Sequence, residues 1–361
     1  MTRGDRPLRV GLVIGQLSTG GAEGQLRLLC ERGDRQAVAP TVYCLSEQTE
    51  PYAALLERAG VAVRVLTGAG LVRAARLRRQ LAADGIDLVH AWLFIANAYA
   101  WAAGGPALVT SARNCKRSGR LLDALNRQAF RASRAIIVNS AQVQHYIERE
   151  YGAPRERIAL VYNAIDLDRF HPRGEQPDGQ GPCVAMVGRL VTQKNPLLFV
   201  AAAAALRAQC PGARFLLIGG GPLQAAVTAA VRAAGLEDHC VVTGDRHDVP
   251  ELLRQADLFW LTSDWEGLPN AVMEALACGL PVVGTDVGGT GELVRDGHEG
   301  FLVARGDADA LVACSLRILA DPVLQARMRG AARARAEAFG VEQMVHATHA
   351  VYERALSGRS A

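Results

Sequence analysis

The stretch "LFWLTSDWEGLPNAVMEALACGLPVVGTD", residues Leu258 to Asp286, contains the signals for a strand, a helix and a second strand. Its two ends, "LFWLTS" and "LPVVGT", are short continuous apolar runs, which are typical of strands buried on both faces. Between them, Pro269 suits the first position of a helix, Gly279 suits a C-terminal cap, and Pro281 blocks continuation. The predicted helix therefore covers residues 269–278.

The same alternation of apolar strands and helical patterns extends over the whole chain. It pauses only at "FHPRGEQPDGQGPC", residues 170–183, where proline, glycine and polar residues cluster. Buried strands separated by helices indicate parallel sheets covered on both faces. The sequence therefore predicts an α/β protein of two doubly wound domains with a cleft between them, residues 1–170 and 171–340.

Composition favours a globular protein of the cytoplasm. Half of the 361 residues are hydrophobic, about a fifth are charged, and no apolar run reaches the ~18 residues of a membrane span. The first apolar run, "VGLVIG", is followed by a glycine turn rather than by a cleavage site, so it predicts a first strand. The eight cysteines form no CxxC pair, which favours reduced core thiols over zinc ligands or disulfides.

Positive charge is concentrated in one segment of the first half. Residues 113–134, "RNCKRSGRLLDALNRQAFRASR", contain seven basic residues and one acid, whereas the whole chain carries a net charge of only +4. Such a segment indicates an anionic partner: a phosphorylated substrate, an anionic membrane surface or a nucleic acid. The alternative is a solvated, arginine-rich helix face.

Two acids flank the start of the predicted helix in the opening stretch. Glu266 lies in the loop before it, and Glu274 lies roughly 7 Å along the helix. The helix start itself offers unpaired N–H groups that suit a diphosphate. A nucleotide sugar along this element would place its sugar near Glu266 and its ribose hydroxyls near Glu274. The alternative is a loop acid and a solvent-facing helix glutamate.

A second group of polar residues follows the strand "CVAMVG", where Arg189 and Lys194 lie in "GRLVTQKNP". Lys194 is one of only two lysines in the chain, the other being Lys116. A compact ammonium retained in so arginine-rich a sequence suits a point contact to phosphate.

In order along the chain, "GRLVTQKNP", "LLIGGGP", "VTGDRHDVPELLRQADLFWLTSDWEGLPNAVMEALACGLPVVGTDVGGTGELV" and "GFLV" resemble the retaining glycosyltransferases of family four. In the first half, "GGAE", "DLVHAW", "VNS" and "VYNAIDLDRF" are similar to the same family. The resemblance covers nearly the whole chain. It implies the GT-B fold, in which two Rossmann-like domains face an interdomain cleft, with the C-terminal helix, residues 341–361, packing back on the N-terminal domain.

The resemblance also implies roles for individual residues. Arg189 and Lys194 would hold the donor diphosphate, Glu274 the ribose and Glu266 the donor sugar, while His90, at the end of the strand "IDLVH", would face that sugar. Further donor-binding residues would be glycines and loop residues near the phosphates: Gly20, Gly21, Gly188, Gly267, Leu268, Pro269 and Asn270. The implied reaction is retaining transfer from a nucleotide sugar, by frequency a UDP sugar, without a metal or cofactor. The DxD-like strings at Asp166–Asp168 and Asp307–Asp309 do not follow strands at the cleft, and the second suits a helix start.

The acceptor belongs to the N-terminal domain in such enzymes, where the basic segment lies. The candidate acceptor residues are Arg113, Asn114, Lys116, Arg117 and Arg120. A lipid-linked or phosphorylated glycan would suit them, and so would peripheral contact with the inner face of an anionic membrane, assisted by the arginines of "RAARLRR". Transfer to a soluble small molecule is an alternative, and no nucleic-acid partner is expected.

Three other functions compete with glycosyl transfer. A nucleotide-sugar 2-epimerase would use the same fold but should carry additional acid and base groups. A nicotinamide oxidoreductase is disfavoured because "GQLSTGGAE" is not a GxGxxG fingerprint. A catalytically silent subunit would be expected to lack Arg189, Lys194 or Glu274, and all three are present.

Overall fold

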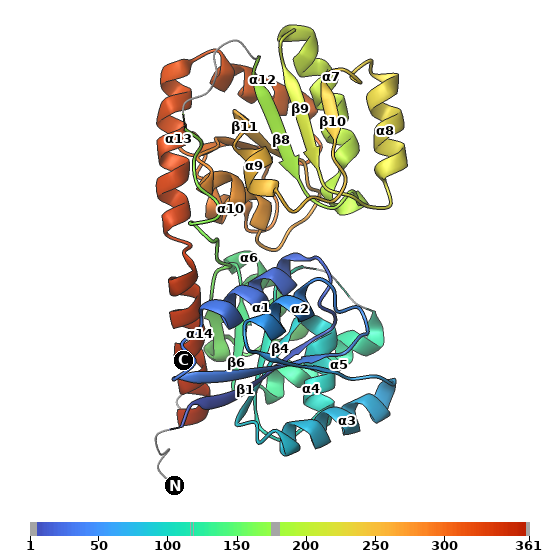
Figure 1. The fold of residues 1–361 in the computed structure, drawn as a ribbon, viewed down its shortest axis with the longest axis vertical. Helices are drawn as coiled ribbons and strands as arrows, with labels where there is room; N and C mark the ends of the chain where they lie inside the picture. Colours follow the sequence, from blue (N-terminus) through green and yellow to red (C-terminus); the bar gives the residue numbers. More distant parts are fainter. Residues whose placement is uncertain (1–5, 116, 118, 175–180, 359–361) are drawn as a thin grey trace. The chain divides into compact units, whose positions relative to one another are not determined.

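The computed structural model describes residues 6–115, 117, 119–174 and 181–358, and it divides the chain into two compact units (Figure 1). The first unit extends to Ala164 and includes the chain from Val341 onward; the second is Ile165–Gly340. The division falls before Ile165 rather than after residue 170. The segment predicted as a linker, 170–183, belongs to the second unit, and its residues 175–180 lie outside the described residues.

The first unit contains a seven-stranded parallel sheet in the order β3-β2-β1-β4-β5-β6-β7. Its strands are β1 Leu8–Ile14, β2 Val38–Cys44, β3 Ala62–Val65, β4 Leu88–Trp92, β5 Ala107–Ala112, β6 Ala135–Val138 and β7 Ile158–Leu160. Its helices are α1 Gly21–Arg32, α2 Tyr52–Arg58, α3 Gly70–Ala83, α4 Leu93–Ala103, α5 Arg120–Ala132, α6 Ala141–Tyr151 and α14 Val341–Ser357, with a 3-10 turn at Arg155–Arg157.

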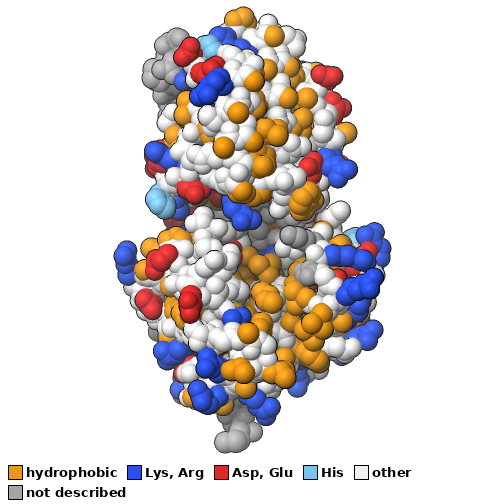
Figure 2. All heavy atoms as spheres, turned by 90° about the vertical axis from the view of Figure 1, so that its right-hand side faces the viewer, with side chains coloured by type: hydrophobic (Ala, Val, Ile, Leu, Met, Phe, Trp, Pro, Cys, Tyr) orange, Lys and Arg blue, Asp and Glu red, His pale blue; other side chains and the backbone are white. Residues whose placement is uncertain are grey.

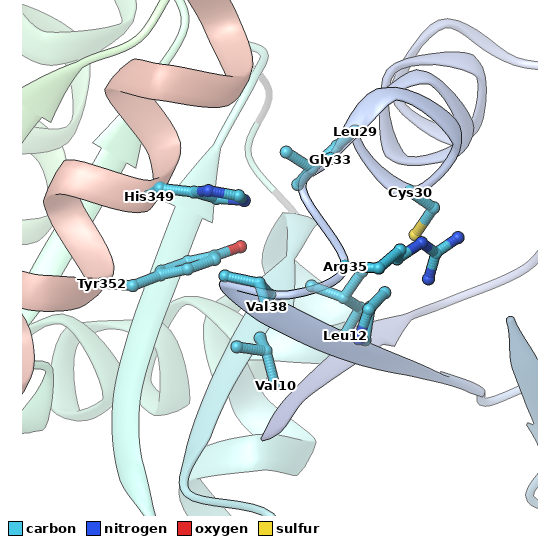
Figure 3. A pocket seen from close by; sticks show the side chains of 10 residues that line it. Val10, Leu12, Leu29, Cys30, Gly33, Arg35, Val38, His349 and Tyr352 are labelled. Atoms are coloured by element: carbon cyan, nitrogen blue, oxygen red, sulfur yellow. The ribbon is translucent and has the colours of Figure 1, made fainter. Parts of the chain in front are cut away.

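Helix α14 brings the C-terminal part of the chain into the core of the first unit, where it packs on α1, β5 and β6. Tyr352 is 1% exposed and His349 lies one turn before it. Figure 3 shows both side chains directed from α14 toward the first strands of the sheet, across a small cavity lined also by Val10, Leu12 and Cys30. The core of this unit therefore depends on residues from both ends of the chain.

The second unit contains a six-stranded parallel sheet in the order β10-β9-β8-β11-β12-β13. Its strands are β8 Cys183–Val187, β9 Arg214–Ile218, β10 Cys240–Val242, β11 Leu258–Leu261, β12 Val282–Thr285 and β13 Gly300–Val303. Its helices are α7 Pro196–Gln209, α8 Gln224–Ala233, α9 Val249–Leu253, α10 Asn270–Ala277, α11 Thr290–Leu293, α12 Ala308–Leu319 and α13 Pro322–Glu337, with a 3-10 turn at Thr192–Lys194.

Both sheets have the doubly wound order in which the chain runs outward from a central strand in both directions. The predicted α/β architecture is therefore confirmed. All eight cysteines are free thiols. Over the residues that the structure describes, no helix combines the length and the apolar character needed to cross a bilayer.

Candidate functional site

The loops after β8 and β11 meet at the carboxyl edge of the second sheet, because these strands are parallel neighbours. The Asp264 amide donates to the Gln193 carbonyl at 2.8 Å, and the Thr262 hydroxyl donates to the Lys194 carbonyl at 2.8 Å. These two bonds fix the short turn that carries Lys194 against the end of β11. Lys194 is thus positioned by backbone contacts that do not involve its ammonium group.

The ammonium of Lys194 forms an ion pair with Glu266, with Nζ 2.5 Å from Oε1. The Ser263 hydroxyl donates to the same oxygen at 2.6 Å, whereas among the described residues Oε2 has only a long contact of 3.5 Å to Gln193. The Glu266 side chain is 6% exposed and that of Lys194 is 19% exposed. Because an ammonium has three donor protons, Lys194 keeps capacity to bind another oxygen while paired with Glu266.

Glu274 lies on α10 and is partly exposed. Burial raises the pKa of its carboxyl to about 7, against the opposing effect of the positive charges of Arg169 and Lys194. Lys194 is therefore in electrostatic range of both glutamates of the opening stretch. Arg169 was not among the predicted residues, since nothing in the local sequence indicates that it approaches α10.

Arg189 follows β8 and differs from Lys194 in being exposed. Within the described part of the chain, its side chain enters none of the ion pairs. The backbone of Gly188, directly before it, is closely approached by the glycine loop of "LLIGGGP". A Cβ atom at Gly219, where φ is +134°, would lie 2.2 Å from the Gly188 carbonyl oxygen. That loop therefore shapes the backbone around Gly188.

The loop from Gly267 to Asn270 leads into α10, whose N-cap is Pro269. Since proline has no polar side chain, Pro269 does not cap the helix through its side chain. The loop is supported by a glycine pair that the sequence prediction left unassigned. The Gly289 amide donates to the Gly267 carbonyl at 2.6 Å, and a Cβ atom at Gly288 would lie 2.4 Å from the Glu266 carbonyl oxygen.

In the first unit, the structure contradicts the expectation that His90 ends its strand. His90 is the middle residue of β4, in register with Leu12 of β1, and it is completely buried. Its Nδ1 lies 2.8 Å from the hydroxyl of Tyr352 on α14. Burial, assisted by the charge of Arg113, holds the pKa of His90 well below its usual range. His90 is therefore a buried residue in the middle of β4, bonded to α14, and its contact with a donor sugar stays a prediction.

Gly20 and Gly21 lie where the first unit begins its first helix, α1. Gly20 is the N-cap residue, in an extended conformation that any residue can adopt, with φ of −169°. A Cβ atom there would lie 2.2 Å from the carboxylate of Glu23. The close neighbour that the structure reveals at Gly20 is therefore the side chain of Glu23, and a role in donor binding stays a prediction.

The predicted acceptor residues have very different surroundings. Arg113 is 8% exposed, stacks on Trp92 and donates to Asn163, whereas Arg120 is exposed at the start of α5. Arg117 is exposed and forms an ion pair with Glu150. Asn114 is partly exposed, and Lys116 lies outside the described residues.

The DxD-like strings have local structural roles. The Asp166 carboxylate accepts from the amides of Asp168 and Arg169, both at 3.2 Å, and Asp307 caps α12 through the Ala310 amide at 2.9 Å. The described ranges contain no group of three or more histidine, cysteine or acidic side chains that could hold a metal ion.

Two family models match the chain in succession. Residues 19–169 match the model described as Glycosyltransferase Family 4, and residues 168–335 match Glycosyl transferases group 1. Together the two models cover nearly all of both units.

Among curated proteins, an Escherichia coli UDP-Gal:alpha-D-GlcNAc-diphosphoundecaprenol alpha-1,3-galactosyltransferase is 30% identical over 204 residues, covering 53% of this chain and 52% of the relative. The 2-deoxystreptamine glucosyltransferase of Streptomyces kanamyceticus is 30% identical over 249 residues, 65% of this chain and 64% of that protein. The matched part thus spans about half to two thirds of each relative. Among solved structures, Anabaena HepE in complex with UDP has a TM-score of 0.85 at 22% identity, covering 96% of this chain and 99% of that one, which establishes the shared fold.

Proposed function

The chain belongs to glycosyltransferase family four, and from that premise we propose that it transfers a sugar from a UDP-linked donor, with retention of configuration and without a metal, to a lipid-linked or phosphorylated glycan. Glycosyl transfer as such follows from the two family models. The finer assignment rests on one observation above all: Lys194, paired with Glu266 at 2.5 Å, lies within electrostatic range of Glu274 at the same sheet edge.

Lys194 and Arg189 are suited to bind the donor diphosphate. Lys194 keeps donor capacity toward phosphate oxygens while Glu266 fixes its position. Arg189 follows the neighbouring β8 and is exposed. The start of α10, where Pro269 provides no side-chain cap, adds the positive end of the helix dipole, which favours a phosphate. Fixed donors of this kind stabilise the negative charge that develops on the leaving diphosphate.

Glu274 and Glu266 are assigned to the two ends of the donor. An ionised Glu274 carboxylate can accept from both hydroxyls of a ribose. Glu266 retains acceptor capacity at Oε2, where the described residues provide only the long Gln193 contact, so this oxygen suits a sugar hydroxyl. The Lys194 pair and the Ser263 hydroxyl then hold Glu266 through Oε1.

For retention, we propose attack on the face from which the diphosphate departs. The anomeric carbon–oxygen bond breaks with its electron pair going to the diphosphate oxygen, and the acceptor oxygen bonds to the anomeric carbon. The acceptor proton passes to the departing phosphate oxygen, so the reaction is balanced without a protein nucleophile. The two cations at Arg189 and Lys194 supply the charge compensation for which other enzymes use a metal.

A membrane-associated acceptor agrees with the surface of the first unit. On α3, Leu71 is 84% exposed and Val72 is 57% exposed, and arginines follow at 73, 76, 78 and 79. Figure 2 shows a face of the molecule on which hydrophobic and basic side chains lie close together. Exposed apolar residues beside basic ones favour peripheral contact with an anionic membrane, here the inner face of the cytoplasmic membrane.

The proposal is tested by incubating the protein with UDP sugars in EDTA, with either a polyprenyl-diphosphate-linked sugar or 2-deoxystreptamine as acceptor. We expect UDP release only with the lipid-linked acceptor, and a product with the donor's anomeric configuration by NMR. Transfer to 2-deoxystreptamine would contradict the lipid-linked acceptor and indicate a soluble acceptor of secondary metabolism. Conversion of a UDP sugar to its epimer without an acceptor would replace the proposal with a 2-epimerase.

A further inference from the structure

Polar side chains follow four neighbouring strands at the carboxyl edge of the first sheet. Trp92 ends β4, Arg113 follows β5, Asn139 follows β6, and Asn163 lies shortly after β7. The strands are parallel, and their last residues are in register, with Trp92 opposite Ser111 and Ala112 opposite Val138. The four side chains are therefore brought to one place although they are widely separated in the sequence.

Arg113 is the central residue of this group. Its guanidinium lies 4.0 Å from the centre of the Trp92 ring, and its Nη1 donates to Oδ1 of Asn163 at 2.8 Å. Arg113 is 8% exposed and Asn163 is 5% exposed. Neither the indole nor the amide carries a compensating negative charge, and no ion pair to Arg113 is found among the described residues. Burial lowers the pKa of Arg113 to about 10.

Several buried polar atoms beside the guanidinium also lack a partner in the described protein. Two of them are donors, Nε of Arg113 and Nε1 of Trp92, and the third, Oδ1 of the 1% exposed Asn139, is an acceptor that would take a hydroxyl of the ligand rather than its anionic oxygens. Folded proteins satisfy most buried polar atoms, and a buried cation without a counter-charge is costly. An oxyanion would accept from the guanidinium and the indole N–H and would supply the missing charge.

We propose that Arg113, stacked on Trp92 and held by Asn163, forms a subsite for an anionic phosphate group of the acceptor substrate. This inference rests on the proposed function, because it makes the acceptor of that reaction a phosphorylated compound. The proposed subsite uses Arg113 alone and does not involve the other arginines of the basic segment. Arg117 already pairs with Glu150 and is exposed, so the subsite is built on a single buried arginine.

The test uses pyrophosphate as the probe and Lys194→Met as the background, which removes the proposed diphosphate contact in the second unit. Pyrophosphate binding is measured by titration calorimetry at constant ionic strength, with and without the additional change Arg113→Met. Arg131→Met is the matched control, since Arg131 is an exposed arginine of the same basic segment. We expect Arg113→Met to weaken binding at least about tenfold, and Arg131→Met to leave it within about twofold.

Equal binding in the Arg113 and Arg131 variants would overturn the subsite. UDP binding by the wild type and by the single variants Lys194→Met and Arg113→Met tests the donor site separately. If Lys194→Met does not weaken UDP binding, the diphosphate assignment fails while the subsite can still stand.

Thermal unfolding without ligand separates a binding role from a structural one. Replacing an uncompensated buried cation by an apolar side chain of similar length should leave the melting temperature of the first unit unchanged or raised. A melting temperature several degrees below that of wild type would identify Arg113 as a structural residue and would contradict the proposal. Arg113→Lys, which keeps the charge, should restore part of the pyrophosphate binding.

Discussion

Lys194 is the residue whose sequence-based assignment gained most from the structure. Lysine is scarce in this arginine-rich chain, which indicates a phosphate contact for Lys194, but the sequence does not show that Lys194 pairs with Glu266. Glu266 is 72 positions away in sequence, and the pair forms because β8 and β11 are neighbours in the sheet. The sequence therefore indicated the two residues, while only the fold could show that they touch.

Lys194→Met should lower kcat/KM by about 100- to 1,000-fold, because it removes a fixed positive charge next to the leaving group. Steady-state kinetics with the UDP sugar would measure this loss. Lys194→Arg, which keeps the charge but changes its geometry, should lose less. Wild-type rates in Lys194→Met, with the fold intact by circular dichroism, would remove Lys194 from the mechanism.

Glu274 should give donor binding a pH dependence near neutrality. Its folded-state pKa of about 7 means that the carboxyl becomes a full anion only above that pH. If the anion binds ribose, kcat/KM for the donor should rise through pH 7 in the wild type, and the rise should be absent in Glu274→Gln. An identical profile for the two proteins would exclude the ribose role.

The same pKa predicts an effect on stability with a defined sign. Folding raises the pKa of Glu274 above its unfolded value of 4.5. The stability that the protonated carboxyl contributes to the fold is therefore fully present below pH 4.5 and is lost as the pH rises through 7. At pH 8, Glu274→Gln should therefore raise the free energy of unfolding by about 1–3 kcal/mol. Chemical denaturation at pH 8 and pH 5 would show a much larger gain at the higher pH.

At the scale of the element, α10 followed its sequence signals closely. Helix 269–278 was predicted from Pro269, Gly279 and Pro281, and the structure has Asn270–Ala277, with Pro269 as the N-cap residue. Proline and glycine act through backbone geometry, which is local and therefore visible in sequence. The support from Gly288 and Gly289 was missed because it joins two loops from different strands.

Gly288→Ala should destabilise the second unit and disturb the loop that carries Glu266. Gly288 has φ of +56°, and its added Cβ would meet the Glu266 carbonyl at 2.4 Å. Gly297→Ala is the matched control, since its φ is +75° but nothing lies within 4 Å of the added atom. The left-handed conformation costs both variants about 1–2 kcal/mol, and only Gly288→Ala should lose more and also bind UDP more weakly. Equal losses of stability and UDP affinity in the two variants would mean that the close approach of Gly288 to the Glu266 carbonyl does not support the loop.

The placement of His90 at a strand end was wrong, and helix α14 accounts for its burial. The local pattern "IDLVH" places a histidine near a strand end, but the helix that covers it comes from residues more than 250 positions later. Tyr352→Phe removes the one hydrogen bond that the His90 ring forms within the described part of the chain. It should therefore destabilise the first unit by about 1–3 kcal/mol, measured by thermal unfolding, with UDP affinity unchanged. Unaltered stability would show that the His90–Tyr352 bond contributes nothing to the docking of α14.

At the scale of the whole molecule, the sequence predicts the two-sheet architecture more accurately than it predicts the boundary between the two units. Alternating buried strands and helices are repeated along the entire chain, so the two parallel sheets followed from many independent segments. The division between the units falls at Ala164, before the proline- and glycine-rich stretch that composition predicts as the linker. Such composition marks a loop, but whether that loop belongs to one unit depends on long-range packing that composition does not contain.

We expect the site around Lys194, Glu266 and Glu274 to bind the UDP part of a donor without a metal. Calorimetry or thermal shift with UDP, GDP, ADP and NAD in the presence of EDTA would measure this binding. A ligand at about 100 times its Kd stabilises the folded state by about 2.7 kcal/mol, which is readily detected. We expect a response to UDP that Lys194→Met strongly weakens. A response to NAD alone, or to UDP only when magnesium is restored, would contradict this expectation.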